Sequence, residues 1–135
     1  MTSDADGPIT GMNHFTVLTD DLDRTRAFYR VLGLQEGARP PLGFPGAWLY
    51  VAGHPVLHVI ARPPLPSERR GVLDHMAFSA RGLAPLVERL RAAGIAHEVR
   101  RQAESRVWQL FLFDPNGARV ELDFDPTEPA PTPAP

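Results

Sequence analysis

Two stretches of the chain share one design and decide its fold: HFTVLTDDLDRTRAFYRVLGL at residues 14–34 and HMAFSARGLAPLVERLRAAGI at residues 75–95. Each begins with a histidine in a short apolar run, continues with apolar residues at helical spacing, and ends in a glycine followed by a large aliphatic residue. In both stretches the closing glycine follows the histidine by 19 residues. Because an internal repeat reflects a repeated structural unit, the chain is predicted to contain two copies of one module.

Each module is predicted to fold as a strand, a helix and three further strands. In the first module, residues 13–19 alternate and are rich in Phe, Val, Leu and Thr, which is typical of a strand. Asp20 or Asp21 can cap the following helix, and Gly33 fits the left-handed position that commonly ends one. The later strands are expected near residues 34–38, 48–51 and 56–60 in the first module and near 97–102, 107–113 and 119–124 in the second. The order βαβββ, present twice, predicts an α+β fold.

Composition and charge exclude several classes of protein. The chain has 135 residues, of which 43% are hydrophobic and 22% charged, as is typical of one soluble globular domain. It has no cysteine, which excludes a thiolate nucleophile and a cysteine-ligated zinc site. A net charge of -2 indicates no broad surface for nucleic acid, and no apolar run is long enough to span a membrane. Without the pattern of a secretory signal at its start, the chain is expected in the cytoplasm.

The repeat also sets the expected domain boundaries. Residues 1–9 are small and acidic and are interpreted as a flexible N-terminus. A single domain is expected over residues 10–124, with one module at about 10–62 and the other at about 71–124. Residues 125–135 contain five prolines, which neither continue a helix nor donate to a sheet, and predict an extended, flexible tail.

Four residues that can bind a metal occupy matching places in the two modules. His14 and His75 belong to the first strands, and His58 and Glu121 to the last strands, 44 and 46 residues further on. A pseudo-twofold pairing of the modules would bring the four side chains to one point. Imidazole and carboxylate together suit one divalent ion of Zn, Ni, Fe, Mn or Co. Four protein ligands on an octahedral ion leave two adjacent positions, which can chelate a substrate with two neighbouring oxygens.

Each of these residues also has an ordinary structural explanation. A single histidine in an apolar strand is often a core residue bonded to a neighbour, and Glu121 shares its strand face with Arg119 and Asp123, which allows a simple ion pair. The coincidence of four metal-binding residue types at equivalent repeat positions favours the metal site. His54 and His97 match no such position and are interpreted as a hairpin-turn residue and a strand-start residue.

Both ends of the domain resemble those of a known superfamily. Residues 11–17 (GMNHFTV), 27–29 (AFY) and 32–34 (LGL) are similar to the opening of vicinal-oxygen-chelate proteins, the glyoxalase/bleomycin resistance/dioxygenase group. Residues 113–117 (FDPNG), followed by Val120 and Glu121, are similar to their closing pair of strands. The resemblance covers nearly the whole of residues 11–124. It is specific for the superfamily and only weakly specific for any one activity.

The resemblance implies a fold, an assembly and a metal site. The implied fold is two paired βαβββ modules that form a barrel-like cup, and chains of this size usually form homodimers whose cup combines modules from two chains. The implied metal ligands are His14, His75 and Glu121. His58 stands where glyoxalase I enzymes carry a glutamate, which removes one carboxylate from their proton-transfer mechanism.

Four functions remain open from the sequence. The first is a metal-dependent, glyoxalase-like isomerase, epimerase or lyase acting on a small carbonyl or hydroxy substrate, with Glu121 as both ligand and catalytic base. The second is an extradiol-type dioxygenase, since two histidines and one carboxylate are the iron(II) pattern for oxygen chemistry. The third is a fosfomycin-type thiol transferase, and the fourth is a metal-free drug-binding protein like the bleomycin-resistance members.

Substrate-binding residues are predicted from the strands that should line the cup. The aromatic residues expected on one face are Trp48, Tyr50, Trp108, Phe111 and Phe113. Some of them can equally be core or dimer contacts. Arg106, just before a strand, is a candidate for binding an anionic substrate. The expected partners are a small-molecule substrate and a second copy of the chain, without nucleic acid or membrane.

Overall fold

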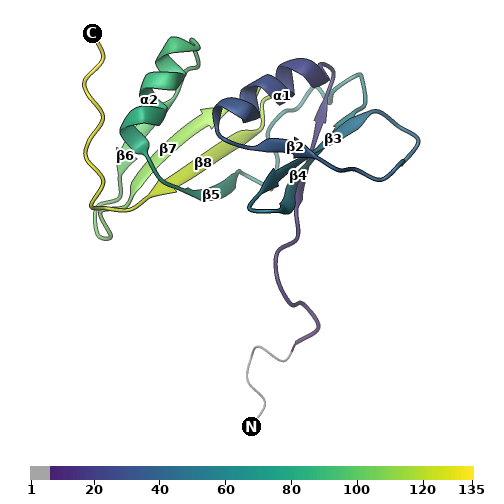
Figure 1. Cartoon of the computed structure of the whole chain (residues 1–135), viewed down its shortest axis with the longest axis horizontal. Helices are drawn as coiled ribbons and strands as arrows, with labels where there is room; N and C mark the ends of the chain where they lie inside the picture. Colours follow the sequence, from purple (N-terminus) through teal and green to yellow (C-terminus); the bar gives the residue numbers. More distant parts are fainter. Residues whose placement is uncertain (1–6) are drawn as a thin grey trace.

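A computed structural model describes residues 7–135, so that most of the predicted N-terminal segment, residues 1–9, lies outside the described residues. Figure 1 shows two modules side by side, each with one helix and four strands. The elements follow the order β1 (Phe15–Thr19), α1 (Leu22–Val31), β2 (Gln35–Gly37), β3 (Gly46–Val51), β4 (His54–Ala61), β5 (Met76–Ala80), α2 (Leu83–Ala92), β6 (Glu98–Arg101), β7 (Trp108–Phe113) and β8 (Arg119–Phe124). Neither helix is long and apolar enough to cross a membrane, within the described part of the chain.

The two sheets have the same topology. The first has the strand order β1-β4-β3-β2 and the second β5-β8-β7-β6. In each sheet the first strand of the module pairs in parallel with the last strand, and the other neighbours are antiparallel. The predicted α+β fold with paired βαβββ modules is therefore confirmed. The parallel pair also explains why residues at the two ends of a module meet.

Each sheet has one face in the core and one face left open. Side chains alternate along a strand, so every second residue faces the helix of its module. Leu57 and Val59 on β4 are almost completely buried, as are Leu110 and Leu122 in the second sheet. The residues between them point to the opposite face, where no helix covers the sheet. This open face carries the predicted metal ligands.

Local sequence explains where the elements begin and end. Asp21 caps α1, because its side chain accepts a hydrogen bond from the Arg24 backbone N–H at 3.0 Å. The turn between β3 and β4 is shorter than the sequence predicts, since residues 52–55 were expected to form it. Ala52 and Gly53 both have positive φ, which makes a two-residue hairpin turn, so His54 lies in β4 and not in the turn.

The C-terminal tail completes the cap of α2. Gly82 stands at the N-cap of this helix and has no side chain to accept hydrogen bonds from its first N–H groups. Glu128 fills that place, with carboxylate oxygens 3.0 Å from the Gly82 nitrogen and 2.8 Å from the Leu83 nitrogen. The Trp108 indole N–H also donates to the Glu128 carbonyl oxygen at 2.9 Å. Residues 125–135 contain no helix or strand, and they are tied to the second module at Glu128.

A buried polar network joins the two modules. The Tyr29 hydroxyl on α1 donates to the Asp114 carboxylate at 2.7 Å, although 85 residues separate them. Beside this bond, the Thr19 hydroxyl donates to the Asn116 side-chain oxygen at 2.7 Å, and the Asn116 amide donates to the Thr25 hydroxyl at 3.0 Å. The turn between β7 and β8 is thus inserted against α1 and β1 (Figure 1). The residues of the FDPNG motif therefore act in this chain as an inter-module contact.

Removing the Tyr29 hydroxyl is expected to destabilise the protein. In Tyr29→Phe one buried Asp114 oxygen loses its donor, and an unsatisfied buried acceptor costs about 1–3 kcal/mol. The measurement is the free energy of unfolding from urea denaturation. Tyr50→Phe is the matched control, because the Tyr50 hydroxyl donates to the Ala38 carbonyl oxygen at a more exposed place. Loss of this bond should change the free energy of unfolding by at most about 0.5 kcal/mol. Equal effects in the two variants would contradict the inserted-turn explanation.

Candidate metal centre

The first module brings two of the predicted ligands together. His14 immediately precedes β1, and Thr16, two residues on, is the register partner of His58 on β4. The two imidazole rings consequently stack, with their centroids 3.7 Å apart. Trp48 on β3 stacks on His58 as well, at 4.1 Å between ring centroids. His58 therefore lies between an imidazole and an indole on the open face of the first sheet. We call His14 and His58 the histidine pair.

His58 has an unused nitrogen. Its Nε2 atom is buried and has no hydrogen-bond partner among the described residues. Burial, and then the neighbouring His14, lowers the pKa of the His58 imidazole. A lowered pKa favours the neutral ring, which is the form that binds a metal ion. Because a buried nitrogen without a partner is costly, this atom fits a site completed by a bound ion.

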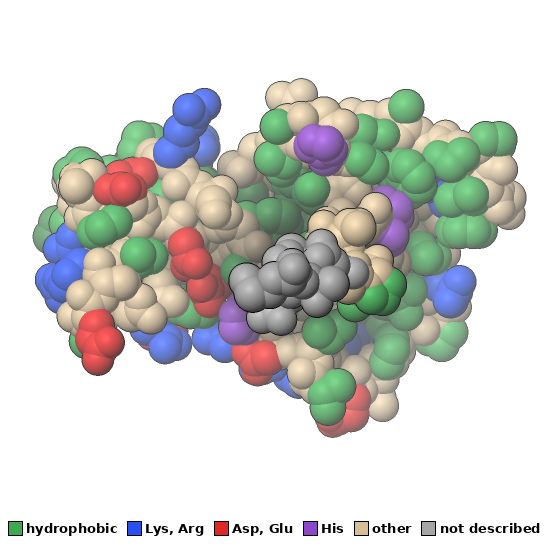
Figure 2. Space-filling view, turned by 90° about the horizontal axis from the view of Figure 1, so that it is seen from below, with side chains coloured by type: hydrophobic (Ala, Val, Ile, Leu, Met, Phe, Trp, Pro, Cys, Tyr) green, Lys and Arg blue, Asp and Glu red, His purple; other side chains and the backbone are tan. Residues whose placement is uncertain are grey.

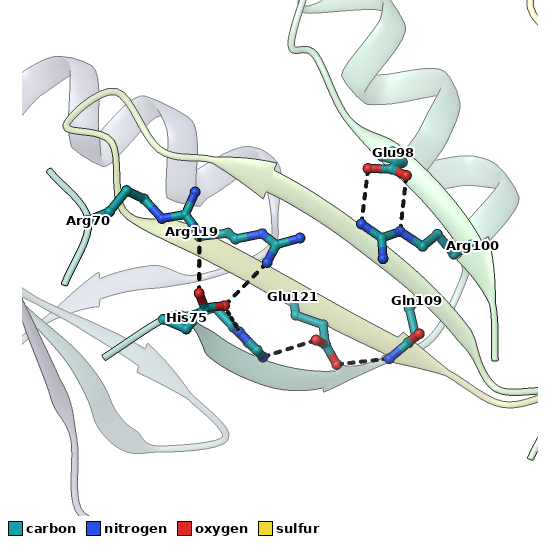
Figure 3. Close-up of polar contacts among 8 residues, drawn as sticks. Arg70, His75, Glu98, Arg100, Gln109, Arg119 and Glu121 are labelled. Carbon is teal, nitrogen blue, oxygen red and sulfur yellow. Dashed lines mark hydrogen bonds and ion pairs between the residues drawn. The ribbon is translucent and has the colours of Figure 1, made fainter. Parts of the chain in front are cut away.

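The second module brings the other two predicted ligands together in the same way. His75 immediately precedes β5, and Ala77, two residues on, is the register partner of Glu121 on β8. The His75 Nε2 atom lies 3.1 Å from a Glu121 carboxylate oxygen, as Figure 3 shows. The other Glu121 oxygen accepts a hydrogen bond from the Gln109 amide at 3.4 Å. We call His75 and Glu121 the histidine–glutamate pair.

A polar residue before each first-strand histidine orients its ring. The His14 Nδ1 atom lies 2.6 Å from the Asn13 side-chain oxygen, and the His75 Nδ1 atom lies 2.8 Å from the Asp74 carboxylate. Since Nδ1 donates in each case, Nε2 is the nitrogen that a metal ion would bind, as in metal-binding histidines with an outer hydrogen-bond acceptor. In His75 this atom lies against the Glu121 carboxylate. The hydrogen bond with His75 and, to a smaller extent, the nearby arginines hold the pKa of the Asp74 carboxyl below its usual range. The sequence interpretation did not use this signal, although both repeats contain it.

The two pairs are separate within one chain. Among residues 7–135, no three His, Cys, Asp or Glu side chains lie close enough together to hold a metal ion. Figure 2 likewise shows histidine side chains at separate places on the face it views. The fold therefore creates two matched half-sites, each with two of the predicted ligands. The single four-ligand centre stays a prediction.

Asp123 adds a second carboxylate beside Glu121. The two residues point to the same face of β8, and burial together with the Glu121 carboxylate raises the pKa of Asp123 to about 6. One Asp123 oxygen is buried without a partner among the described residues. A carboxyl group with this pKa can both take up and release a proton near neutral pH. Asp123 is therefore a candidate proton carrier that the sequence interpretation had placed only in an ion pair.

Two of the predicted aromatic residues form a wall beside the histidine pair. Trp48 covers His58, and Tyr50 lies two residues further along the same face of β3. The Tyr50 ring packs on Gly37, where an added Cβ atom would lie 2.8 Å from the ring. Its hydroxyl donates to the Ala38 carbonyl oxygen. Tyr50 is thus held in place by β2, so that its ring can line the cup while its hydroxyl is already engaged.

The prediction that Trp108 lines the same face as Phe111 and Phe113 is wrong. Odd-numbered residues of β7 face the open side, so Trp108 points to the core side, where it packs against the buried hydrophobic residues and bonds Glu128. Phe111 and Phe113 do face the open side, as register partners of Glu121 and Arg119.

Arg106 lies just before a strand, as predicted, and its role in binding an anionic substrate stays a prediction. It is exposed, has a φ of 63°, and lies in the loop before β7, at the end of the strand away from Phe113. The arginines that lie near Glu121 are Arg119 on its own strand and Arg100 on β6. Both guanidinium groups lie over the ring of Phe111.

The fold and these half-sites define a class: a two-module α+β protein with ligand-type side chains on the paired first and last strands of each module. Comparison with known proteins gives the family. The sequence model of the Glyoxalase/Bleomycin resistance protein/Dioxygenase superfamily matches residues 11–122. The chain therefore belongs to this superfamily, as its opening and closing motifs predicted. No curated protein matches the chain.

Several solved structures share the fold. A protein assigned to the glyoxalase family from Bacillus anthracis has a TM-score of 0.73 and 22% identity, covering 88% of this chain and 98% of its own. A variant of the fosfomycin resistance protein FosX from Listeria monocytogenes, in complex with Mn(II) and 1S,2S-dihydroxypropylphosphonic acid, has a TM-score of 0.69 and 20% identity, covering 87% and 93%. Lactoylglutathione lyase from Agrobacterium tumefaciens has a TM-score of 0.61 and 22% identity, covering 87% and 96%. At these identities the likeness concerns the fold.

Proposed function

We propose that this protein is a metal-dependent enzyme whose complete site forms between two copies of the chain. The histidine pair of one copy and the histidine–glutamate pair of the other would supply the four ligands. The observation that carries the proposal is the matched geometry of the two pairs, together with the buried, unpartnered Nε2 atom of His58. Each pair is too small to hold an ion by itself, and each lies on an open sheet face.

A symmetric dimer would complete both sites at once. In a twofold dimer the same two surfaces meet twice, so the histidine pair of each copy would face the histidine–glutamate pair of the other. The open faces also explain why Ala77 and Ser79 on β5 are exposed in the single chain, since a second sheet would cover them. The assembly would therefore bury the open faces as well as the ligands.

The donor set fits a borderline divalent ion. Three imidazole nitrogens and one carboxylate suit Zn, Ni, Fe, Mn or Co, and the FosX structure with Mn(II) shows that this fold accommodates such an ion in another protein. When bound, the ion would supply Lewis-acid polarisation of two neighbouring substrate oxygens.

The chain's own residues would bind the substrate and move a proton. We propose a small carbonyl or hydroxy compound as substrate and an isomerase, epimerase or lyase reaction. Glu121 would take a proton from the substrate carbon next to its carbonyl, and the bond from Gln109 to one of its oxygens supports this role. Asp123 would receive or return that proton, because its side chain lies beside Glu121 on the same face of β8. Trp48, beside the histidine pair, would exclude water from the side of the site opposite Glu121.

Elemental analysis of protein purified without a histidine tag tests the proposal. We expect near-stoichiometric Zn, Ni, Fe, Mn or Co in the purified protein or after incubation with the ion. An oxygen-consuming reaction that occurs only with Fe(II) would instead indicate an extradiol-type dioxygenase. A protein that takes up none of these ions would instead belong with the metal-free drug-binding members of the superfamily.

A further inference from the structure

We propose that Arg100 and Arg119, stacked on Phe111, form a subsite for a small anionic group carried by the substrate. The inference rests on the proposed function, because it places this group next to the oxygens that the centre would chelate. It narrows the substrate class to a carbonyl or hydroxy compound with a carboxylate, phosphate or phosphonate at its other end.

Strand register places the two arginines around one ring. Phe111 on β7 is the register partner of Glu121 on β8 on one side and of Glu98 on β6 on the other. The Arg119 guanidinium carbon lies 4.5 Å from the centre of the Phe111 ring, and that of Arg100 lies 4.7 Å from it. The guanidinium groups thus come from the two strands that flank β7, and both lie on the open face that carries Glu121 (Figure 3).

Phe111 serves as a platform for these charges. It is buried, although it does not belong to the main hydrophobic core of the molecule. Attraction between a guanidinium and an aromatic face holds each long arginine side chain near a fixed position. Fixing the side chains in advance reduces the entropy that binding an anion would otherwise cost.

Both arginines have hydrogen-bond donors to spare. A guanidinium has five N–H donors, and Glu98 takes only two from Arg100, while Asp74 takes one from Arg119. These partner carboxylates are more than half exposed, with 61% and 57% of their side chains accessible. Exposed ion pairs of this kind contribute little, so an incoming anion can share or displace them. The Arg119 side chain is only 20% exposed, which strengthens its attraction for an anion.

A cavity lies next to this platform. It has a volume of about 390 Å³ and is lined by residues that include Arg70, Glu98, Phe111, Phe113 and Arg119. That volume is within the usual size of small-molecule sites. Phe111 and Arg119 of the proposed subsite thus line this cavity together with Arg70, whereas Arg100 is not among its lining residues. A substrate reaching from Glu121 across Phe111 would place its far end here.

Two probes that differ by one phosphate group test the subsite. Dihydroxyacetone and dihydroxyacetone phosphate both present a carbonyl oxygen with a neighbouring hydroxyl, and only the second carries an anionic end. We expect the metal-loaded protein to bind the phosphate compound at least about tenfold more tightly by calorimetry, because hydrogen bonds to charged groups contribute about 1.5–3 kcal/mol. In the double variant Arg100→Gln, Arg119→Gln this preference should disappear while the metal content stays unchanged.

Arg89→Gln is the matched control, because it removes the same charge from an exposed position on α2. It should keep the preference for the phosphate compound. Equal binding of the two probes by the wild-type protein, or a preference that survives in the double variant, would overturn the proposal.

A second measurement separates this proposal from that of the metal centre. Inorganic phosphate and acetate are titrated into metal-free protein, and the arginine side-chain N–H signals are followed by NMR. Shifts of the Arg100 and Arg119 signals with either anion would support the subsite even if the protein takes up no metal, and the stronger anion would identify the group. No shift with either anion would overturn the subsite while leaving the metal centre to its own test.

Discussion

Glu121→Gln is expected to lower metal affinity by at least about 100-fold and to abolish activity, since even outer partners of metal ligands are worth 10–100-fold. Glu121 is the one carboxylate among the four predicted ligands, and an amide oxygen is a much weaker donor than a carboxylate. The substitution keeps the size of a side chain that is only 7% exposed. The fold should therefore survive, and the loss should appear in metal content and in kcat/KM.

Two comparisons make this experiment decisive. Glu88→Gln makes the same chemical change at an exposed position on α2 and should leave metal content and activity unchanged. Asp123→Asn should keep the metal but slow proton transfer, because Asp123 lies beside Glu121 and is not one of the proposed ligands. A Glu121→Gln variant that retains stoichiometric metal and full activity would remove Glu121 from the centre. Thermal unfolding of each variant separates loss of a ligand from loss of the fold.

The fold could be predicted from the sequence because its repeat is strong. The two histidine-to-glycine stretches have the same length, and a βαβββ unit needs its first and last strands to pair before it can bury its apolar face. That pairing places the two ligand-type residues of each module side by side, and the structure shows this arrangement twice. Matching positions in a repeat were therefore a better guide to the half-sites than any single histidine.

The wrong face predicted for Trp108 and the position of the arginines have different physical reasons. Trp108 was grouped with Phe111 because both are aromatic and close in sequence, but side chains three residues apart on a strand point to opposite faces. Arg100 and Arg119 meet on the open face because their strands flank Phe111, and this strand order is not contained in the sequence pattern. Strand alternation alone could have corrected the prediction for Trp108.

The packing of the two modules against each other could not be predicted from the sequence for a different reason. It depends on the buried contacts of the β7–β8 turn with α1 and β1, in particular the bond from Tyr29 to Asp114 across 85 residues. These contacts hold the modules of one chain together on their helix side, away from the ligand pairs. The sequence pattern contains the turn motif, but it does not say which surface the turn enters. The same contact explains how one chain can present two half-sites without joining them.

Mixing two inactive variants is expected to restore metal binding. The first variant, His14→Ala, His58→Ala, has lost the histidine pair, and the second, His75→Ala, Glu121→Gln, has lost the histidine–glutamate pair. Each should be free of metal alone. In a mixed dimer, the intact histidine pair of the second variant would face the intact histidine–glutamate pair of the first, which rebuilds one native site. With random exchange, about one quarter of all sites should bind metal and regain activity.

The design works because the two possible architectures give opposite results. If all four ligands converged within one chain, neither variant could supply a complete set, and mixing would restore nothing. The exchange is made by co-expression with two different tags, so that mixed dimers can be isolated and their metal content measured against each parent. Mixed dimers without metal, formed from variants that are folded by circular dichroism, would refute the shared site. Recovery would show that dimer formation and metal binding are linked, since each copy then lacks a complete site until the other is present.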